Sequence, residues 1–254
     1  MASAWASPLT NFVAGQHISI GTNISNVIVS GGGGGFAVST TAWKNNANAT
    51  SVGVTVAPSA GNACVVIVDA YLGSSANHAV SDNIDGTTGW HEITNVSAVA
   101  NCNVSAWVNW SMPAGVTTIT CTAGGGAQVT GGIVHEVSGG ISTFTSGEAE
   151  ITQFLNASDV LTAAILNHTA ASVFFAVQAN ATDGNPITMT INSSGTTGGT
   201  WVLADNTNSQ ETDATDWIAA SVVNMVVSTS ASRSHAWSGM PSSDGGGLLI
   251  FCLH

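Results

Sequence analysis

The chain has 254 residues and a formal net charge of −12, and only 6% of its residues are charged, against roughly 25% in an average soluble domain. Lys44 and Arg233 are its only strong bases. Two isolated cations cannot replace the counterions of a nucleic acid or hold the chain on an anionic membrane, so both are excluded as partners.

The first sixty residues contain short β-like runs on both sides of a glycine run. His17–Ile20 and Val27–Val29 precede Gly31–Gly35, and the alternating stretches Phe36–Trp43 and Val52–Val56 follow it. Five consecutive glycines have little conformational preference. They are either a hinge between an N-terminal arm and the body or a wide loop between two strands, and the flanking β-like runs favour the loop. We therefore assign residues 1–60 to an N-terminal arm with the first strands.

The stretch from Gly61 to Gly140 reads as strands separated by turns. Cys64–Val68 is a short apolar run bounded by turn residues, which predicts a buried strand. Asn103–Trp110 alternates, so Val104, Ala106 and Val108 share one face and Asn103, Ser105, Trp107 and Asn109 share the other. Val116–Cys121 has strong β propensity, and Val129–Val137 completes the first half.

The second half continues with the same rhythm. Its predicted strands lie around 149–154, 160–166, 173–177, 187–191, 201–203, 218–227, 234–237 and 248–253. Residues 216–228 are long enough for a helix, but their paired valines favour a strand. Short strands at regular spacing predict an all-β fold, an antiparallel β-sandwich or jelly roll.

A weak internal repeat connects residues 61–140 with residues 149–254. Ser172–Val177 resembles Ala63–Val68 at an offset of 109 (172 − 63), and Trp201 follows Trp90 by 111 (201 − 90). The pair Gly246-Gly247 before an apolar run follows Gly131-Gly132 by 115 (246 − 131). The sequence therefore predicts a sandwich over 61–254 with two pseudo-repeated halves.

No catalytic motif is visible, so we expect a protein that is not an enzyme. Asp82, Asn83 and Asp85 are the best metal candidate, because oxygen ligands on a loop suit Ca²⁺. Their spacing does not match an EF-hand, and Asp and Asn also simply build turns, which is the favoured interpretation. No other cofactor is expected.

Cysteine spacing argues against zinc, because none of the four cysteines forms a Cys-x-x-Cys pair. Cys64 and Cys252 lie inside apolar runs and are expected to pack as small hydrophobes. Cys102 and Cys121 flank one candidate hairpin and are candidates for a disulfide if the geometry allows it.

Eight tryptophans raise the question of carbohydrate binding. Trp107 and Trp110 have opposite parity on one strand, so they face opposite ways and form no common platform. Aromatic residues in a sandwich more often fill a core or an interface.

Several short motifs of this sequence together resemble a known domain. They are Gly61-Asn62 before the first apolar strand, the turn from Asp82 to Trp90, Ala114–Thr120, and Glu136-Val137-Ser138-Gly139. The pattern resembles a β-sandwich domain of tailed-phage minor tail and capsid-surface structural proteins, also seen in some secreted bacterial proteins. Val137 departs from the usual Tyr, and the resemblance covers about 61–253.

The resemblance implies a structural virion protein, a capsid decoration or minor tail protein that acts by protein docking. Its expected partners are other virion proteins, with a homo-oligomer as the working state and a host-surface glycan as a further possible ligand. We expect synthesis in the host cytoplasm, because the first residues lack the features of a signal peptide, and a final position on the virion surface. The alternatives are an extracellular glycan-binding adhesin or receptor-binding module, a self-assembling extracellular filament subunit and, with the lowest weight, a hydrolase.

Overall fold

The computed structural model describes fourteen segments of the chain, which are residues 28–30, 35–47, 49–72, 74–99, 102–127, 129–144, 149–154, 160–165, 172–182, 190–191, 201–207, 217–227, 233–238 and 245–254. They form an all-β sandwich of antiparallel sheets, as the sequence predicts. The predicted run 17–20 and the glycines at 31–34 lie outside the described residues. No helix in the described segments has the length and apolarity that a membrane span requires.

The first half of the chain builds two sheets. Their strands are β1 (Ile28–Ser30), β2 (Ala37–Ala47), β3 (Ser51–Thr55), β4 (Ala63–Tyr71), β5 (Ala79–Asp82), β6 (Trp90–Val99), β7 (Cys102–Asn109), β8 (Thr118–Thr122) and β9 (Val129–Ser138), with the short 3₁₀ turn η1 (Ser75–Asn77) after β4. The larger sheet has the order β1-β2-β9-β4-β7-β6, and the smaller sheet has the order β3-β8-β5.

The second half repeats this plan. Its strands are β10 (Ala149–Phe154), β11 (Val160–Ile165), β12 (Ser172–Thr182), β13 (Thr190–Ile191), β14 (Val202–Thr207), β15 (Trp217–Val227), β16 (Arg233–Ser238) and β17 (Gly245–Leu253). The sheet orders are β10-β17-β12-β15-β14 and β11-β16-β13. They become the orders of the first half when each strand is numbered eight lower, so β2–β9 and β10–β17 are two copies of one topology.

We call β2–β9 the first unit and β10–β17 the second unit. Within each unit the first strand pairs with the eighth, the second with the seventh and the third with the sixth. This nesting is the jelly-roll pattern. Because β2 and β3 pair with β9 and β8, residues 37–55 belong to the first unit, and the boundary expected at residue 60 falls inside it.

A shared β-bulge fixes the correspondence between the units. The register shifts between Glu92 and Thr94 in β6, and between Leu203 and Asp205 in β14. In each unit, the residue just before the bulge begins a row of residues that lie opposite one another on neighbouring strands. In the first unit this row is Glu92, Trp107, Val66 and Val134. In the second unit the corresponding row is Leu203, Val223, Ala176 and Ile250.

The two rows correct the predicted offsets. β4 corresponds to β12 with an offset of 110 (176 − 66), and β9 to β17 with an offset of 116 (250 − 134). The predicted 109 and 115 were each one residue short, and a one-residue slip exchanges the two faces of a strand. The offset of 111 between the tryptophans agrees with the bulge (203 − 92 = 111).

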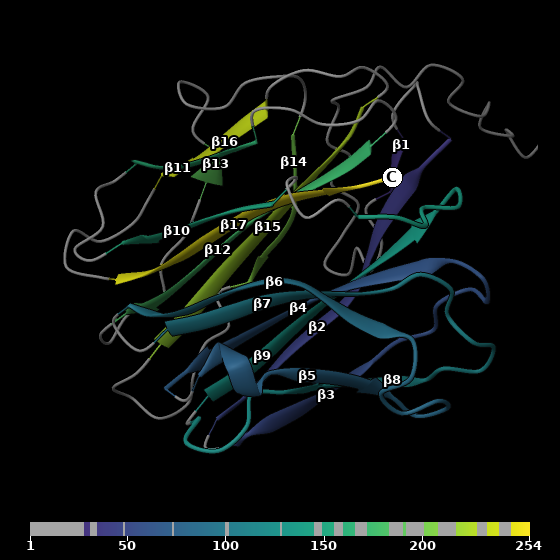
Figure 1. Cartoon of the computed structure of the whole chain (residues 1–254), viewed down its shortest axis with the longest axis horizontal. Coiled ribbons are helices and arrows are strands. Elements are labelled where there is room, and N and C mark those ends of the chain that lie inside the picture. The colour runs from purple at the N-terminus through teal and green to yellow at the C-terminus, as the bar shows by residue number, and fades with distance from the viewer. Residues whose placement is uncertain are drawn as a thin grey trace, which may run out of the picture.

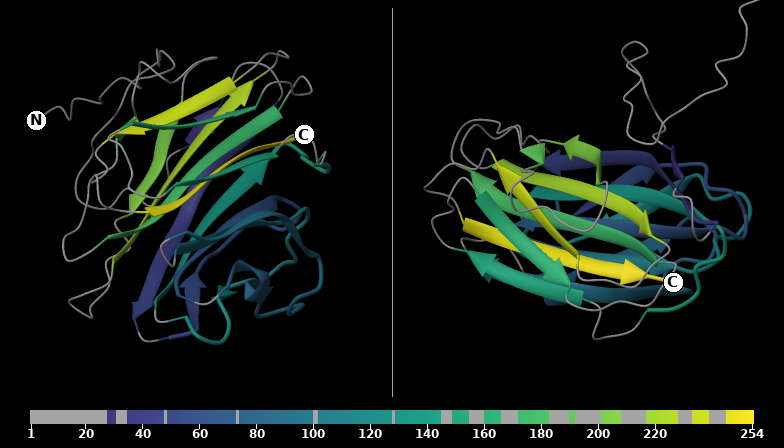
Figure 2. Two further views of the ribbon diagram at one scale, coloured as in Figure 1. Left: turned by 60° about the vertical axis from the view of Figure 1, so that its left-hand side comes forward. Right: turned by 90° about the horizontal axis from the view of Figure 1, so that it is seen from above.

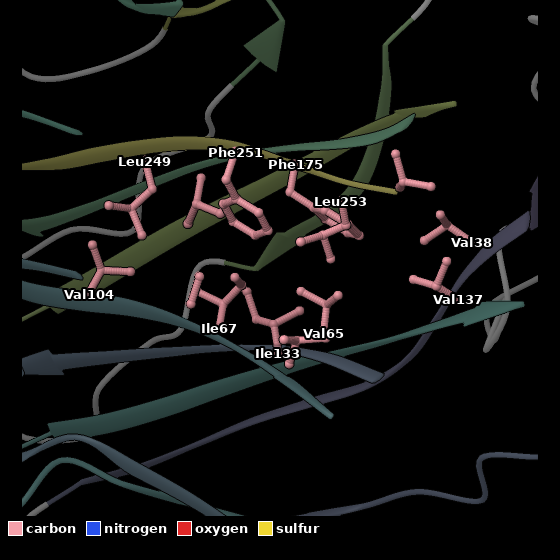
Figure 3. Packing of buried hydrophobic residues seen from close by; sticks show 14 of the residues in the cluster. Val38, Val65, Ile67, Val104, Ile133, Val137, Phe175, Leu249, Phe251 and Leu253 are labelled. Carbon is pink, nitrogen blue, oxygen red and sulfur yellow. The ribbon is translucent and has the colours of Figure 1, made fainter. Parts of the chain in front are cut away.

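Four layers result, with the small sheets outside and the two large sheets packed face to face (Figures 1 and 2). We call the apolar layer between the large sheets the central core. It takes Val65 and Ile67 from β4, Val104 and Ala106 from β7, and Phe175, Leu249 and Phe251 from the second unit, among others (Figure 3). The ring centroids of Phe175 and Phe251 lie 5.3 Å apart.

The opposite faces of these strands fill the lateral core of the first unit, between its two sheets. This core contains Val66 and Val68 from β4, Ile119 and Cys121 from β8, and Trp90. Strand β4 is thus buried on both sides, which explains the continuous apolar run from Ala63 to Val68. The two units share one continuous apolar layer.

Candidate functional site

The turn from Asp82 to Trp90 is held together by the Asp82 carboxylate. Its Oδ1 accepts hydrogen bonds from the backbone N–H groups of Ile84 (2.9 Å) and Asp85 (2.8 Å), and its Oδ2 accepts one from Trp90 Nε1 (3.0 Å). Asp82 and Trp90 are both buried. The carboxylate therefore closes the turn and satisfies a buried indole N–H.

Asn83 ties the same turn to the neighbouring strand. Its Oδ1 accepts hydrogen bonds from the backbone N–H groups of Thr117 (2.8 Å) and Thr118 (2.9 Å). Asp85 is exposed, and its backbone carbonyl accepts a hydrogen bond from the Thr88 N–H. Within the described part of the chain no three His, Cys, Asp or Glu residues form a group suited to a metal. These bonds support the turn interpretation, and the Ca²⁺ site stays a prediction.

Hydrogen bonds also connect two other sequence motifs, the turn before β4 and the end of β9. Glu136 Oε1 accepts hydrogen bonds from the Asn62 side-chain amide and from the Ser59 backbone N–H (3.0 Å). Asn62 precedes β4, and Glu136 lies near the end of β9. The sequence motifs that carry the resemblance are thus connected by hydrogen bonds, which join Asp82 to Trp90, Asn83 to Thr117, and Asn62 to Glu136. They fix turns and strand ends.

A buried Ser–His pair is the main feature that the sequence did not indicate. Ser105 Oγ lies 2.8 Å from His78 Nδ1 and accepts a hydrogen bond from Trp107 Nε1 (2.8 Å). The indole can only donate, so Ser105 Oγ is the acceptor of that bond, whereas the imidazole tautomer decides which of Ser105 Oγ and His78 Nδ1 donates in the other. Burial lowers the pKa of His78 to about 4. Because Ser105 has no exposed surface, no substrate reaches its hydroxyl, and the pair holds η1 against the sheet.

A second set of side-chain hydrogen bonds joins η1 to the surface through β6. The Ser75 hydroxyl donates to Asn95 Oδ1 (2.8 Å), and the Asn95 amide donates to Glu92 Oε1 (2.6 Å). Glu92 is exposed and lies opposite the half-buried Trp107 on the neighbouring strand. A fixed indole beside a carboxylate and an amide is therefore presented at this edge of the first unit.

Two further histidines are fully buried in different layers. His135 lies in the central core against Phe175, with ring centroids 5.6 Å apart, and His235 of β16 lies between Trp201 (4.9 Å) and Trp237 (4.3 Å). Burial lowers the pKa of each histidine to about 3, so both are neutral at physiological pH. The lateral face of β12 also differs from that of β4, since Gln178 stands where the first unit has Val68 (178 − 68 = 110).

The pair Trp107 and Trp110 is oriented as predicted. Trp107 packs against the lateral core of the first unit, whereas Trp110 packs against the central core, so the two face opposite sides of the sheet. Trp90, Trp201 and Trp237 are buried. The described indoles therefore contribute mainly to packing.

The disulfide expected between Cys102 and Cys121 is not formed. Both are buried free thiols on opposite sides of the large sheet: Cys102 of β7 lies in the central core, and Cys121 of β8, in the small sheet, lies in the lateral core. Burial raises the pKa of both thiols, so they pack as small hydrophobes. Cys64 is a buried free thiol in the lateral core, and Cys252 is also buried, as expected.

Fold and geometry together define an all-β protein made of two jelly-roll units. Comparison with known proteins finds no matching family model, curated protein or solved structure.

Proposed function

We propose that this chain is a structural virion protein, a capsid decoration or minor tail protein that acts by docking to other proteins. The observation that carries the proposal is the fusion of two jelly-roll units through one apolar layer. Such a body presents sheet edges and turns on both sides of a shared core, which suits repeated contacts in an assembly better than the shaping of a cleft.

The use of polar side chains supports the same proposal. The side-chain oxygens of Asp82, Asn83 and Glu136 accept hydrogen bonds that stabilise turns and strand ends. The Ser105–His78 pair is closed to substrate, because Ser105 is fully buried. Arg233, one of two strong bases in the chain, is only 8% exposed. The surface therefore carries few cations, and its contacts depend on shape and on neutral polar groups.

Mass spectrometry of gradient-purified particles from the source culture tests this function. We expect peptides of the chain to remain with the particles through a high-salt wash, in a fixed ratio to a major particle protein. Absence from washed particles, with the chain abundant in the lysate, would refute the proposal.

The edge at Trp107 supports a second candidate function, the binding of a surface saccharide. A partly exposed indole flanked by the Glu92 carboxylate and the Asn95 amide combines a stacking surface with hydrogen-bonding groups. A glycan array tests it with the Glu92→Gln variant as comparison. Binding that the substitution abolishes would support this function, and an array without signal would refute it.

A further inference from the structure

The outer strands of the two large sheets differ in how well they are protected against pairing with another chain. Natural sheet edges are blunted by bulges, prolines, lysines or a covering segment. β6 and β14 carry register shifts after Glu92 and Leu203, and β2 carries one after Thr40 and is partly covered by β1.

In the described part of the chain, β10 shows no bulge, proline, lysine or covering strand, and Glu150 is its one charged residue. It pairs with β17 over six consecutive residues without a register shift, and its sequence, AEITQF, contains neither proline nor lysine. Among the described strands nothing pairs with its other side. β10 is therefore the large-sheet edge that most readily accepts another strand.

An exposed apolar side chain lies on this edge. Ile151 is 49% exposed, and it stands opposite Leu249 of β17, whose side chain belongs to the central core. Ile151 therefore lies on the core-facing side of the sheet, and Ala149, two residues earlier, packs against the core. The apolar layer that joins the two units thus continues to the rim at β10.

The two units already show how such surfaces associate. β10 contacts β6 across the central core, and the corresponding strands β2 and β14 make the same contact. These reciprocal contacts are those of a two-fold interface, in which one surface meets its own copy. These contacts join sheet faces, and at Ile151 the same apolar layer reaches the open edge of β10, where a second copy can continue it about another two-fold axis.

We propose that β10 pairs antiparallel with β10 of a second copy, joining two large sheets into one continuous sheet across a two-fold axis. The choice of a second copy as the partner of β10 rests on the proposed docking function, which expects a homo-oligomer. The inference adds the strand edge through which that homo-oligomer forms. Main-chain hydrogen bonds across the edges and the burial of Ile151 from both copies stabilise the pair.

The symmetry also sets the register. A two-fold axis perpendicular to the sheet keeps both core-facing sides together, so residues of the same parity stand opposite one another. Centring the pair on Ile151 places each Ile151 against its copy and Glu150 against Thr152. Centring it on Glu150 would oppose like charges, which is unfavourable.

Sedimentation of the purified full chain tests the pairing. We expect a particle of about twice 25.4 kDa for the natural chain and a two-fold lower mass for Ile151→Lys, which opposes two ammonium groups at the axis. Ile84→Lys is the matched control, because Ile84 is equally exposed, at 49%, and lies in the turn after β5. It should keep the higher mass.

Cross-linking tests the register separately and does not depend on the lysine variant folding. Directly opposed residues of an antiparallel pair have Cβ atoms about 5 Å apart, so Ile151→Cys should oxidise to a covalent dimer and Ile84→Cys should not. A natural chain that sediments as a monomer, or equal masses for the natural chain and Ile151→Lys, would overturn the pairing. A dimer that is missing from particles would refute the virion function and leave the β10 pairing standing.

Discussion

Acidification should destabilise this protein through its buried histidines, His78, His135 and His235. Burial lowers their pKa values to about 4, 3 and 3, whereas in the unfolded chain each is near 6.5. At pH values between the folded and unfolded pKa values, the histidines are protonated in the unfolded chain but not in the folded chain. The stability that they contribute is therefore complete above pH 6.5 and is lost as the pH falls toward the folded values.

The size of the effect follows from the same shifts. At pH 5 each histidine lowers the free energy of unfolding by about 2 kcal/mol relative to neutral pH, and the three together by about 6 kcal/mol. Since whole domains are stable by only about 5–15 kcal/mol, the protein should be close to unfolding at pH 5.

Urea unfolding at pH 7.5 and pH 5.0 measures this loss. The variant His135→Gln removes one titrating group, so its loss between the two pH values should fall to about 4 kcal/mol. His91→Gln, at an exposed position of β6, is the matched control and should behave as the natural chain does. An unchanged loss in His135→Gln, or no loss in the natural chain, would refute the assignment to buried histidines.

Four further predictions concern a turn, calcium binding, packing and thiols. Asp82→Ala removes a carboxylate that accepts three hydrogen bonds and should lower the free energy of unfolding by about 3 kcal/mol, whereas the exposed Asp85→Ala should change it by less than about 0.5 kcal/mol. Calcium and EDTA should leave the melting temperature unchanged, and a rise with calcium concentration would favour the metal site. Gly247→Ala places a methyl group against Val96 across the central core and should cost about 1–3 kcal/mol in a thermal melt, whereas Gly125→Ala meets no atom within 4 Å and should be neutral. Alkylation of the denatured, unreduced chain should modify both Cys102 and Cys121. Protection of these two cysteines from alkylation would contradict their assignment as free thiols.

The sequence was informative about strands because this fold alternates short apolar runs with turn residues. Residues 217–227 form a strand, as their β-branched content predicts. The faces of β7 also follow from period two, with Val104, Ala106 and Val108 in the central core. β5 was not predicted, because four residues carry too weak a pattern.

The partners of these elements were less predictable. Local similarity placed the repeat one residue short, because only the pairing across the sheet, which Val66 makes with Val134, fixes which face a residue occupies. The hydrogen bond between Asn62 and Glu136 spans 74 positions, and the one between His78 and Ser105 spans 27. Nothing in the local composition indicates either contact, so the roles of these side chains required the fold.

Electron cryomicroscopy of purified particles tests the central claim most directly. The account predicts a density of two adjoining jelly rolls, repeated at equivalent positions on the capsid or tail and in contact with other particle proteins. Particles without this density, together with a purified chain that turns over a substrate, would contradict it.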